Sequence, residues 1–372
     1  MLLKVGRLSI FARHMADLLE IDELWITRCF DLARNGIGYV SPNPPVGAVL
    51  VHQNTILAEG YHHFFGGPHA EVDVISNVPA EKKHLIQEST LYVSLEPCCT
   101  TGKTPPCTNL IINSGIKKVR VSAIDPNPNV AGKGIFLLQS HGIDVEFGIL
   151  KEDGEQLIRA FRTNILKARP HVILKWAQSR YGYSGVPGYQ VWFSQPYTQT
   201  WSHRLRVEND SIMVGARTVE TDNPSLTARD YPGRSPVRII YDPNGRLDHH
   251  FNVFKNDGIR IFYFTSTENP IVKANVDFPN LNTFFLAENA NHAAEIVEVL
   301  YRHNIGSLLV EGGSYMHQLF IRENLWDEAW IVQTENETAS GIKAPNLKGK
   351  LIESITLGED TIVGIANAEN KK

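Results

Sequence analysis

Residues 66–76 read GGPHAEVDVIS, and this stretch decides the fold of the first half of the chain. Its glycine-rich turn leads into a short apolar helix, which we predict from His69 to Ser76. Buried strands are predicted on both sides of this helix, at Val46–Val51 and Leu91–Leu95, because both runs are short and aliphatic. Strands that alternate with helices predict an α/β fold with a largely parallel sheet.

The same alternation continues along the chain. Further helices are expected at residues 22–35, 108–113, 134–140, 151–167, 196–208, 290–303 and 314–322. Further strands are expected at residues 118–124, 143–147, 171–177, 211–214, 237–241, 260–264, 307–310 and 328–332. Arg169-Pro170 breaks the pattern, since a proline disfavours a helix before it. We therefore expect an extension at residues 1–21, a first domain at 22–168 and a second at 169–372.

Length and charge exclude several classes of protein. The 372 residues are enough for two or three domains. The net charge of −4 argues against a protein that coats nucleic acid, and the absence of an apolar run of about 18 residues argues against a membrane span. The first fourteen residues are basic without an acid, which weakly resembles a targeting peptide; we favour a plain extension, with Met15 as a second candidate start.

One histidine and two cysteines have the pattern of a zinc site. His69 starts the predicted helix, Cys98 follows the strand that ends at Leu95, and Cys107 comes nine positions later. These residues can fill three corners of a tetrahedral zinc site with water in the fourth, and clustered cysteines suit a metal site in a reducing compartment. Glu71 can carry protons without binding the metal. His-x-Glu fits the zinc nucleobase deaminases, whereas the nine-residue cysteine spacing departs from their usual Pro-Cys-x-x-Cys.

Each of these residues also has a plain structural explanation. A histidine at a helix start is most often a cap, and separate cysteines are most often buried apolar residues; only their combination favours a metal. Cys99 adjoins Cys98 and is expected to be structural, and Cys29 is expected in the core. His62 and His63 can line a pocket, although solvated loop histidines are commoner.

The second half lacks a Gly-x-Gly-x-x-Gly turn between a strand and a helix, which argues against a Rossmann fold. Residues 308–314 read LLVEGGS, a strand, a glycine pair and a helix start. This is either a phosphate-binding turn or a tight connection that needs small residues. Arg204 and Arg206 can bind a phosphate or form a solvated face with Glu208, and Trp192 can be a core residue or a flat surface for an aromatic ring.

Over about residues 22–335 the chain resembles the bifunctional deaminase–reductases of riboflavin biosynthesis. The matching stretches of the first half are Pro42–Gly47, Gly66–Val72, Leu95–Cys98, Gly102–Cys107 and Asp125–Gly134. Those of the second half are Leu174–Ser179, Trp192, Val214–Val219, Asp222–Arg229, Val237–Ile240 and Val310–Ser314. The resemblance implies a three-layer cytidine-deaminase-like domain followed by a domain similar to dihydrofolate reductase. The sequence departs from the family at Thr100-Thr101, where a histidine is usual, and at Tyr181, where an aspartate is usual.

The resemblance also implies the sites. It places one zinc ion on His69, Cys98 and Cys107, with Glu71 as the proton shuttle and with Asn43 and Lys103 at the substrate. It places NADPH near Trp192, Thr218, Asp222 and Gly313, and the sugar phosphate near Arg206, Leu226, Arg229 and Glu311.

The implied enzyme first deaminates a diaminopyrimidinone ribosylamine 5′-phosphate and then reduces its ribosyl group to a ribityl side chain. Its partner is this phosphorylated pyrimidine, without nucleic acid or membrane, and we expect a cytoplasmic homo-oligomer. Two alternatives stay open. One is a monofunctional nucleoside or tRNA deaminase, and the other is a deaminase whose C-terminal domain only binds a ligand.

Overall fold

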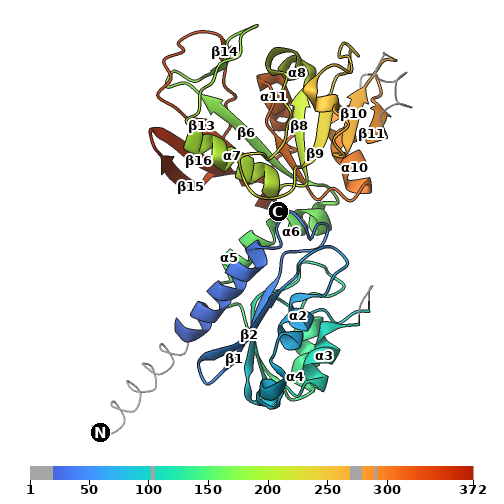
Figure 1. Ribbon diagram of the computed structural model, residues 1–372, viewed down its shortest axis with the longest axis vertical. Coiled ribbons are helices and arrows are strands. Elements are labelled where there is room, and N and C mark those ends of the chain that lie inside the picture. Colours follow the sequence, from blue (N-terminus) through green and yellow to red (C-terminus); the bar gives the residue numbers. More distant parts are fainter. Residues whose placement is uncertain (1–19, 102–104, 269–278, 289–290, 372) are drawn as a thin grey trace. The chain divides into compact units, whose positions relative to one another are not determined.

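The computed structural model describes residues 20–101, 105–268, 279–288 and 291–371. It divides into two compact units, Met1–Lys167 and Ala168–Lys372 (Figure 1). The expected extension lies outside the described residues up to position 19, and its last two residues already belong to a helix at 20–34. No helix within the described ranges is long and apolar enough to cross a membrane.

The sheet of the N-terminal unit has five strands in the order β2-β1-β3-β4-β5. The strands are β1 (Gly47–His52), β2 (Thr55–Tyr61), β3 (Thr90–Leu95), β4 (Lys118–Ala123) and β5 (Asp144–Phe147). Strands β3, β4 and β5 run parallel, whereas β1 runs antiparallel to both of its neighbours. The sheet is therefore mixed, and its edge strand β2 was not predicted.

Helices cover both faces of this sheet and make three layers (Figure 1). Because side chains alternate along a strand, Ala48 and Leu50 of β1 pack in one cluster and Val49 and Val51 in another. The first cluster includes α2, α3 and α4, and the second includes the helix at 20–34. The helices are α2 (Ala70–Ser76), η1 (Ala80–Glu88), α3 (Cys107–Asn113), α4 (Lys133–Ser140), α5 (Lys151–Leu157) and α6 (Arg159–Lys167). The single helix expected at 151–167 is thus two helices.

The C-terminal unit contains a nine-stranded sheet in the order β11-β10-β9-β8-β12-β6-β13-β16-β15. The first seven of these run parallel, and β16 and β15 add an antiparallel edge. Its strands are β6 (His171–Gln178), β8 (Ser211–Gly215), β9 (Val237–Tyr241), β10 (Ile261–Thr265), β11 (Leu281–Phe285), β12 (Ser307–Val310), β13 (Glu328–Gln333), β15 (Lys350–Leu357) and β16 (Asp360–Ala366). The short strands β7 (Tyr183–Gly185) and β14 (Ile342–Lys343) pair separately.

Helices again lie on both faces of the large sheet. Residues of α7 and α8 pack in one cluster, and those of α10 and α11 pack in the other. The helices are α7 (Pro196–Glu208), α8 (Ala216–Asp222), η2 (Asn252–Phe254), α10 (His292–Arg302), α11 (Ser314–Arg322) and η4 (Ala368–Lys371).

The start of the unit is held by a buried ion pair. The Arg169 guanidinium donates to both carboxylate oxygens of Asp327, at 2.6 and 2.8 Å, and Asp327 also accepts from the backbone N–H of Val172 at 2.9 Å.

Candidate active sites

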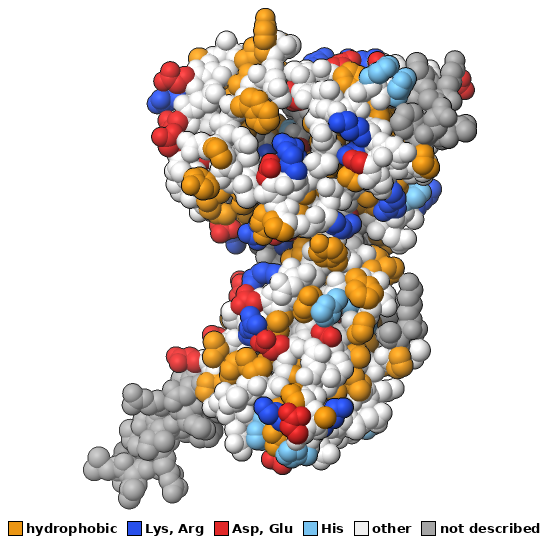
Figure 2. All heavy atoms as spheres, viewed as in Figure 1, with side chains coloured by type: hydrophobic (Ala, Val, Ile, Leu, Met, Phe, Trp, Pro, Cys, Tyr) orange, Lys and Arg blue, Asp and Glu red, His pale blue; other side chains and the backbone are white. Residues whose placement is uncertain are grey.

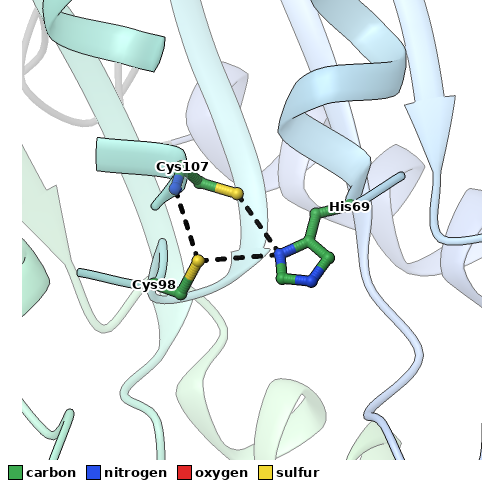
Figure 3. Close-up of side chains that lie close together, drawn as sticks. All are labelled: His69, Cys98 and Cys107. Carbon is green, nitrogen blue, oxygen red and sulfur yellow. Dashed lines mark hydrogen bonds between the residues drawn. The ribbon is translucent and has the colours of Figure 1, made fainter. Parts of the chain in front are cut away.

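His69, Cys98 and Cys107 form a compact cluster of metal-ligand atoms in the N-terminal unit. The His69 Nδ1 atom lies 3.6 Å from Cys98 Sγ and 3.3 Å from Cys107 Sγ, and the three atoms lie within 4.8 Å of one another. Usual zinc bond lengths in a tetrahedron put a nitrogen and a sulfur ligand about 3.6 Å apart. Figure 3 shows the three side chains pointing toward one another. The donor set and its spacing therefore fit zinc, with one position left for water.

Local structure brings these ligands together. His69 is the extended N-cap residue of α2, Cys98 follows the end of β3, and Cys107 is the first residue of α3. The Cys98 sulfur accepts the Cys107 N–H at 3.3 Å, and the Cys98 carbonyl accepts the Thr108 N–H at 3.2 Å. Among the described residues, Cys99 is not part of the cluster, and Cys29 is fully buried in the core.

The charge state of the cluster suits metal binding and proton transfer. Hydrogen bonds from Cys107 and His69 lower the pKa of the Cys98 thiol, so Cys98 is the thiol of the pair that ionises first. Burial and the neighbouring Cys98 raise the pKa of Glu71 to about 7. Glu71 is only 3% exposed and lines the same pocket as His69 and Cys98, a cavity of about 150 Å³. A carboxyl group with this pKa can accept and release a proton near neutral pH.

Asn43 lines the same cavity, and His62 fixes its orientation. His62 is 3% exposed, so it is not a solvated loop histidine. Its Nδ1 lies 2.7 Å from the Pro68 carbonyl oxygen and must donate there, which leaves Nε2 as an acceptor for the Asn43 side-chain N–H at 3.1 Å. The side-chain carbonyl oxygen of Asn43 can then accept a hydrogen bond from a ligand. Lys103, the other expected substrate contact, lies outside the described residues.

A second candidate site lies in the C-terminal unit, where Arg206 and Glu311 pair. Arg206 of α7 donates to the Glu311 carboxylate at 2.6 Å and to the Thr227 carbonyl at 3.0 Å. The Arg206 side chain is 15% exposed and that of Glu311 is 8% exposed. Two residues predicted from different parts of the sequence are thus brought together at the carboxyl end of β12 (Val310). Figure 2 shows a hollow in the surface of the C-terminal unit with basic and acidic side chains at its rim.

The sequence did not single out Lys175 as a member of this cluster. Its ammonium lies 3.9 Å from Glu311, and burial lowers its pKa. Within the described part of the chain, Glu311 Oε1 and Arg206 Nε are buried without a hydrogen-bond partner. Buried polar atoms of this kind normally have partners, so the cluster is suited to complete its hydrogen bonds with a ligand. Lys175 was missed because it lies in a strand that reads as a buried apolar run.

The glycine pair of LLVEGGS packs tightly against β8 and α8. A Cβ atom on Gly312 would lie 2.7 Å from the Val214 side chain, so the connection needs a small residue there. Gly313 has a φ of 79°, and a Cβ atom on it would lie 3.4 Å from the Thr218 hydroxyl. Gly313 and Thr218, both predicted to contact the cofactor, are therefore neighbours.

The other predicted residues of this half are more spread out. Asp222 ends α8 with an exposed side chain, and Trp192 precedes α7 and is 66% exposed. Leu226 is 2% exposed, so it is buried in the structure. The Arg229 side chain is 57% exposed and lies 3.6 Å from Asp230. Tyr181 belongs to the turn at 179–183, where its N–H donates to the Ser179 hydroxyl at 3.3 Å.

Comparison with known proteins identifies both halves. Residues 19–123 match the cytidine and deoxycytidylate deaminase zinc-binding region, and residues 170–334 match the RibD C-terminal domain. The riboflavin biosynthesis protein RibD of Aquifex aeolicus is 34% identical over 92% of this chain and 98% of its own length. The RibD protein of Escherichia coli is 32% identical over 82% of this chain and 86% of its own length.

Solved structures agree with these matches. The diaminohydroxyphosphoribosylaminopyrimidine deaminase/5-amino-6-(5-phosphoribosylamino)uracil reductase of Thermotoga maritima has a TM-score of 0.83 and 35% identity, over 94% of this chain and 99% of that one. Acinetobacter baumannii RibD has a TM-score of 0.83 and 27% identity with the same coverage.

Proposed function

The chain belongs to the RibD family of bifunctional deaminases and reductases in riboflavin biosynthesis, and we propose the substrate and the residues of its two reactions. The N-terminal unit hydrolyses an amino group of a diaminopyrimidinone ribosylamine 5′-phosphate. The C-terminal unit then reduces the ribosyl group to a ribityl side chain with NADPH. The observation that carries the proposal is that two residues of a cluster fit for zinc, His69 and Cys98, line one cavity with the buried carboxyl group of Glu71.

His69, Cys98 and Cys107 would hold the zinc ion, one per chain, since their atoms have the spacing it requires. Bound zinc supplies a water whose pKa is lowered to about 7. Glu71 takes a proton from the attacking water and returns it to the departing ammonia, while oxygen replaces the amino group on the pyrimidine. Asn43, held by His62, accepts a hydrogen bond from the ring, and Lys103 contacts the phosphate.

In the C-terminal unit, the reduction adds a hydride to the sugar carbon that is bonded to nitrogen. The bond between this carbon and the ring oxygen breaks, and the oxygen takes up a proton. Arg206, Arg229 and Leu226 bind the sugar phosphate, and Glu311 holds Arg206 in place. The buried amine of Lys175, whose pKa is lowered by burial, is suited to give up a proton. Thr218, Asp222, Trp192 and Gly313 form the NADPH site, where Gly313 lets the cofactor approach the backbone.

We further propose that the enzyme is a cytoplasmic homo-oligomer that needs no nucleic acid or membrane partner. Sedimentation of the purified chain tests the oligomeric state.

The direct test is a two-step assay with elemental analysis. We expect one zinc per chain, ammonia release from the diaminopyrimidinone ribosylamine phosphate, and NADPH oxidation with the deaminated product. Ammonia release without NADPH oxidation would make the C-terminal unit a binding module. This outcome is tested because Tyr181 stands where the family usually has an aspartate. Deamination of a nucleoside or tRNA in place of this substrate would overturn the proposal.

A further inference from the structure

Glu96 lies between strand β3 and the metal-ligand segment, and none of the roles assigned above uses it. Its side chain is buried, with 3% of the residue exposed. Its carboxylate accepts four backbone N–H bonds. The donors are Asp125 at 3.2 Å, Gly132 at 2.9 Å, Gly134 at 2.9 Å and Ile135 at 3.3 Å.

These hydrogen bonds join the end of strand β3 to the start of helix α4 and to the loop before it. Gly134 and Ile135 lie in the first turn of α4, where free N–H groups and the helix dipole favour a negative charge. Gly132 and Asp125 belong to the loop between β4 and α4. The Glu96 N–H donates to the Ala123 carbonyl at 2.9 Å, so both its backbone and its side chain are fixed to this part of the fold.

Glu96 lines the deaminase cavity together with residues of both segments that its hydrogen bonds join. Cys98, a ligand of the metal cluster, is two residues from Glu96, and Asp125 lines the cavity as well. Gly134 packs closely against Pro97, because a Cβ atom on Gly134 would lie 2.2 Å from the Pro97 carbonyl oxygen.

We propose that Glu96 is a positioning residue of the deaminase site, which sets the Pro97-Cys98 segment and Asp125 by anchoring both to the start of α4. This role rests on the proposed function of the N-terminal unit. Glutamine at this position has one acceptor oxygen, and its amide N–H groups would face two of the four backbone donors. Those donors would lose their partners, and the Cys98 segment would shift relative to His69 and Cys107.

The test compares Glu96→Gln with two controls in the full-length zinc enzyme. Leu138→Ala removes a fully buried side chain from the same helix and lowers stability without touching the anchor. Glu152→Gln removes an exposed carboxylate at the start of α5. NADPH-dependent reduction of pre-deaminated substrate is the internal control for folding of the rest of the chain.

We expect Glu96→Gln to lose zinc to a chelator at least about tenfold faster, because groups outside the ligand shell typically contribute 10–100-fold to metal affinity. Its kcat for ammonia release should fall while reduction stays unchanged. The visible spectrum of the cobalt-substituted protein should shift, which reports a changed ligand geometry. Gly134→Ala places a Cβ atom against the Pro97 carbonyl oxygen and 3.1 Å from the Glu96 carboxylate, so it should shift the same readouts.

A Glu96→Gln protein that matches Leu138→Ala in zinc loss, kcat and cobalt spectrum would overturn the positioning role. If Glu96→Gln does not fold, Gly134→Ala decides by the same comparison. Wild-type protein that binds no zinc would overturn the proposed function as well. If the wild type binds zinc and Glu96→Gln leaves zinc loss, kcat and the cobalt spectrum unchanged, only the positioning role is overturned.

Discussion

The two candidate sites differ in how complete they are. The cluster of His69, Cys98 and Cys107 already has the spacing that zinc requires. The cluster of Arg206, Glu311 and Lys175 pairs its own charges and still leaves Glu311 Oε1 and Arg206 Nε, both described atoms, without a hydrogen-bond partner. The first site is built for a small ion of fixed geometry, and the second is suited to a larger ligand that completes its bonds. Variants of each site should therefore affect one reaction and spare the other.

The largest expected effect is the loss of zinc. Cys98→Ser and Cys107→Ser should each lose the metal and ammonia release, because a thiolate ligand is gone. Cys99→Ser is the matched control and should keep both. Elemental analysis of dialysed protein measures the result, and stoichiometric zinc in Cys98→Ser would contradict the ligand assignment.

The second-largest effect is expected for Glu71→Gln. It keeps the size of the side chain but cannot carry a proton, and general acid–base catalysis is typically worth about 10²–10⁴ in rate. Ammonia release should fall by this factor with zinc retained and NADPH oxidation unchanged. Near-normal ammonia release would assign the proton transfer to another group.

A smaller effect is expected in the C-terminal unit. Arg206→Ala should weaken reduction by about 1.5–3 kcal/mol, roughly 10- to 150-fold in kcat/KM, since it removes a charge-assisted bond to the substrate. Arg204→Ala offers a matched control, because Arg204 lies on the same helix and pairs with Glu208 near the surface. Ammonia release should be unchanged in both, and equal reduction by the two variants would contradict the assignment of Arg206.

The smallest effect is a pH dependence of stability. Burial lowers the pKa of His317 to about 4, so the folded protein holds it neutral while the unfolded chain takes up a proton below about pH 6.5. The stability from this histidine is present above pH 6.5 and is lost as the pH falls toward 4. Between pH 6.5 and 5.5 the loss should be about 1 kcal/mol. Urea unfolding at each pH measures it, and His317→Gln should flatten the dependence.

The two sites also differ in how well the sequence predicts them. The zinc ligands lie on elements close in sequence, and their residue types are rare enough to be recognised together. Lys175 was missed because a lysine in an apolar strand carries no signal until the fold buries it. His62 was weighed as a pocket residue, but a solvated loop histidine was the commoner expectation. Glu311 and Arg206 were expected near the same phosphate, but their pairing depends on contact between α7 and the end of β12.

Among the elements, helices α7 and α11 and strands β9 and β12 have the predicted bounds, since each has a clear apolar pattern and end signals. The edge strands β2, β11 and β15 were missed, whereas the edge strand β5 was predicted. Strand β15 is mostly exposed, so no buried face marks it in the sequence. Helix α8 is short and contains Thr218, Val219 and Thr221, which are β-branched and disfavour a helix prediction.

The Arg169–Asp327 pair determines how the reductase half could be produced by itself. A fragment that begins at residue 168 keeps both partners of this buried pair. One that begins at residue 170 leaves the Asp327 carboxylate buried without its guanidinium, and breaking a buried pair in this way typically costs about 3–5 kcal/mol. Such a loss is a large part of the stability of an ordinary domain. Moving the start of the fragment from residue 168 to residue 170 should therefore lower its free energy of unfolding by about this amount.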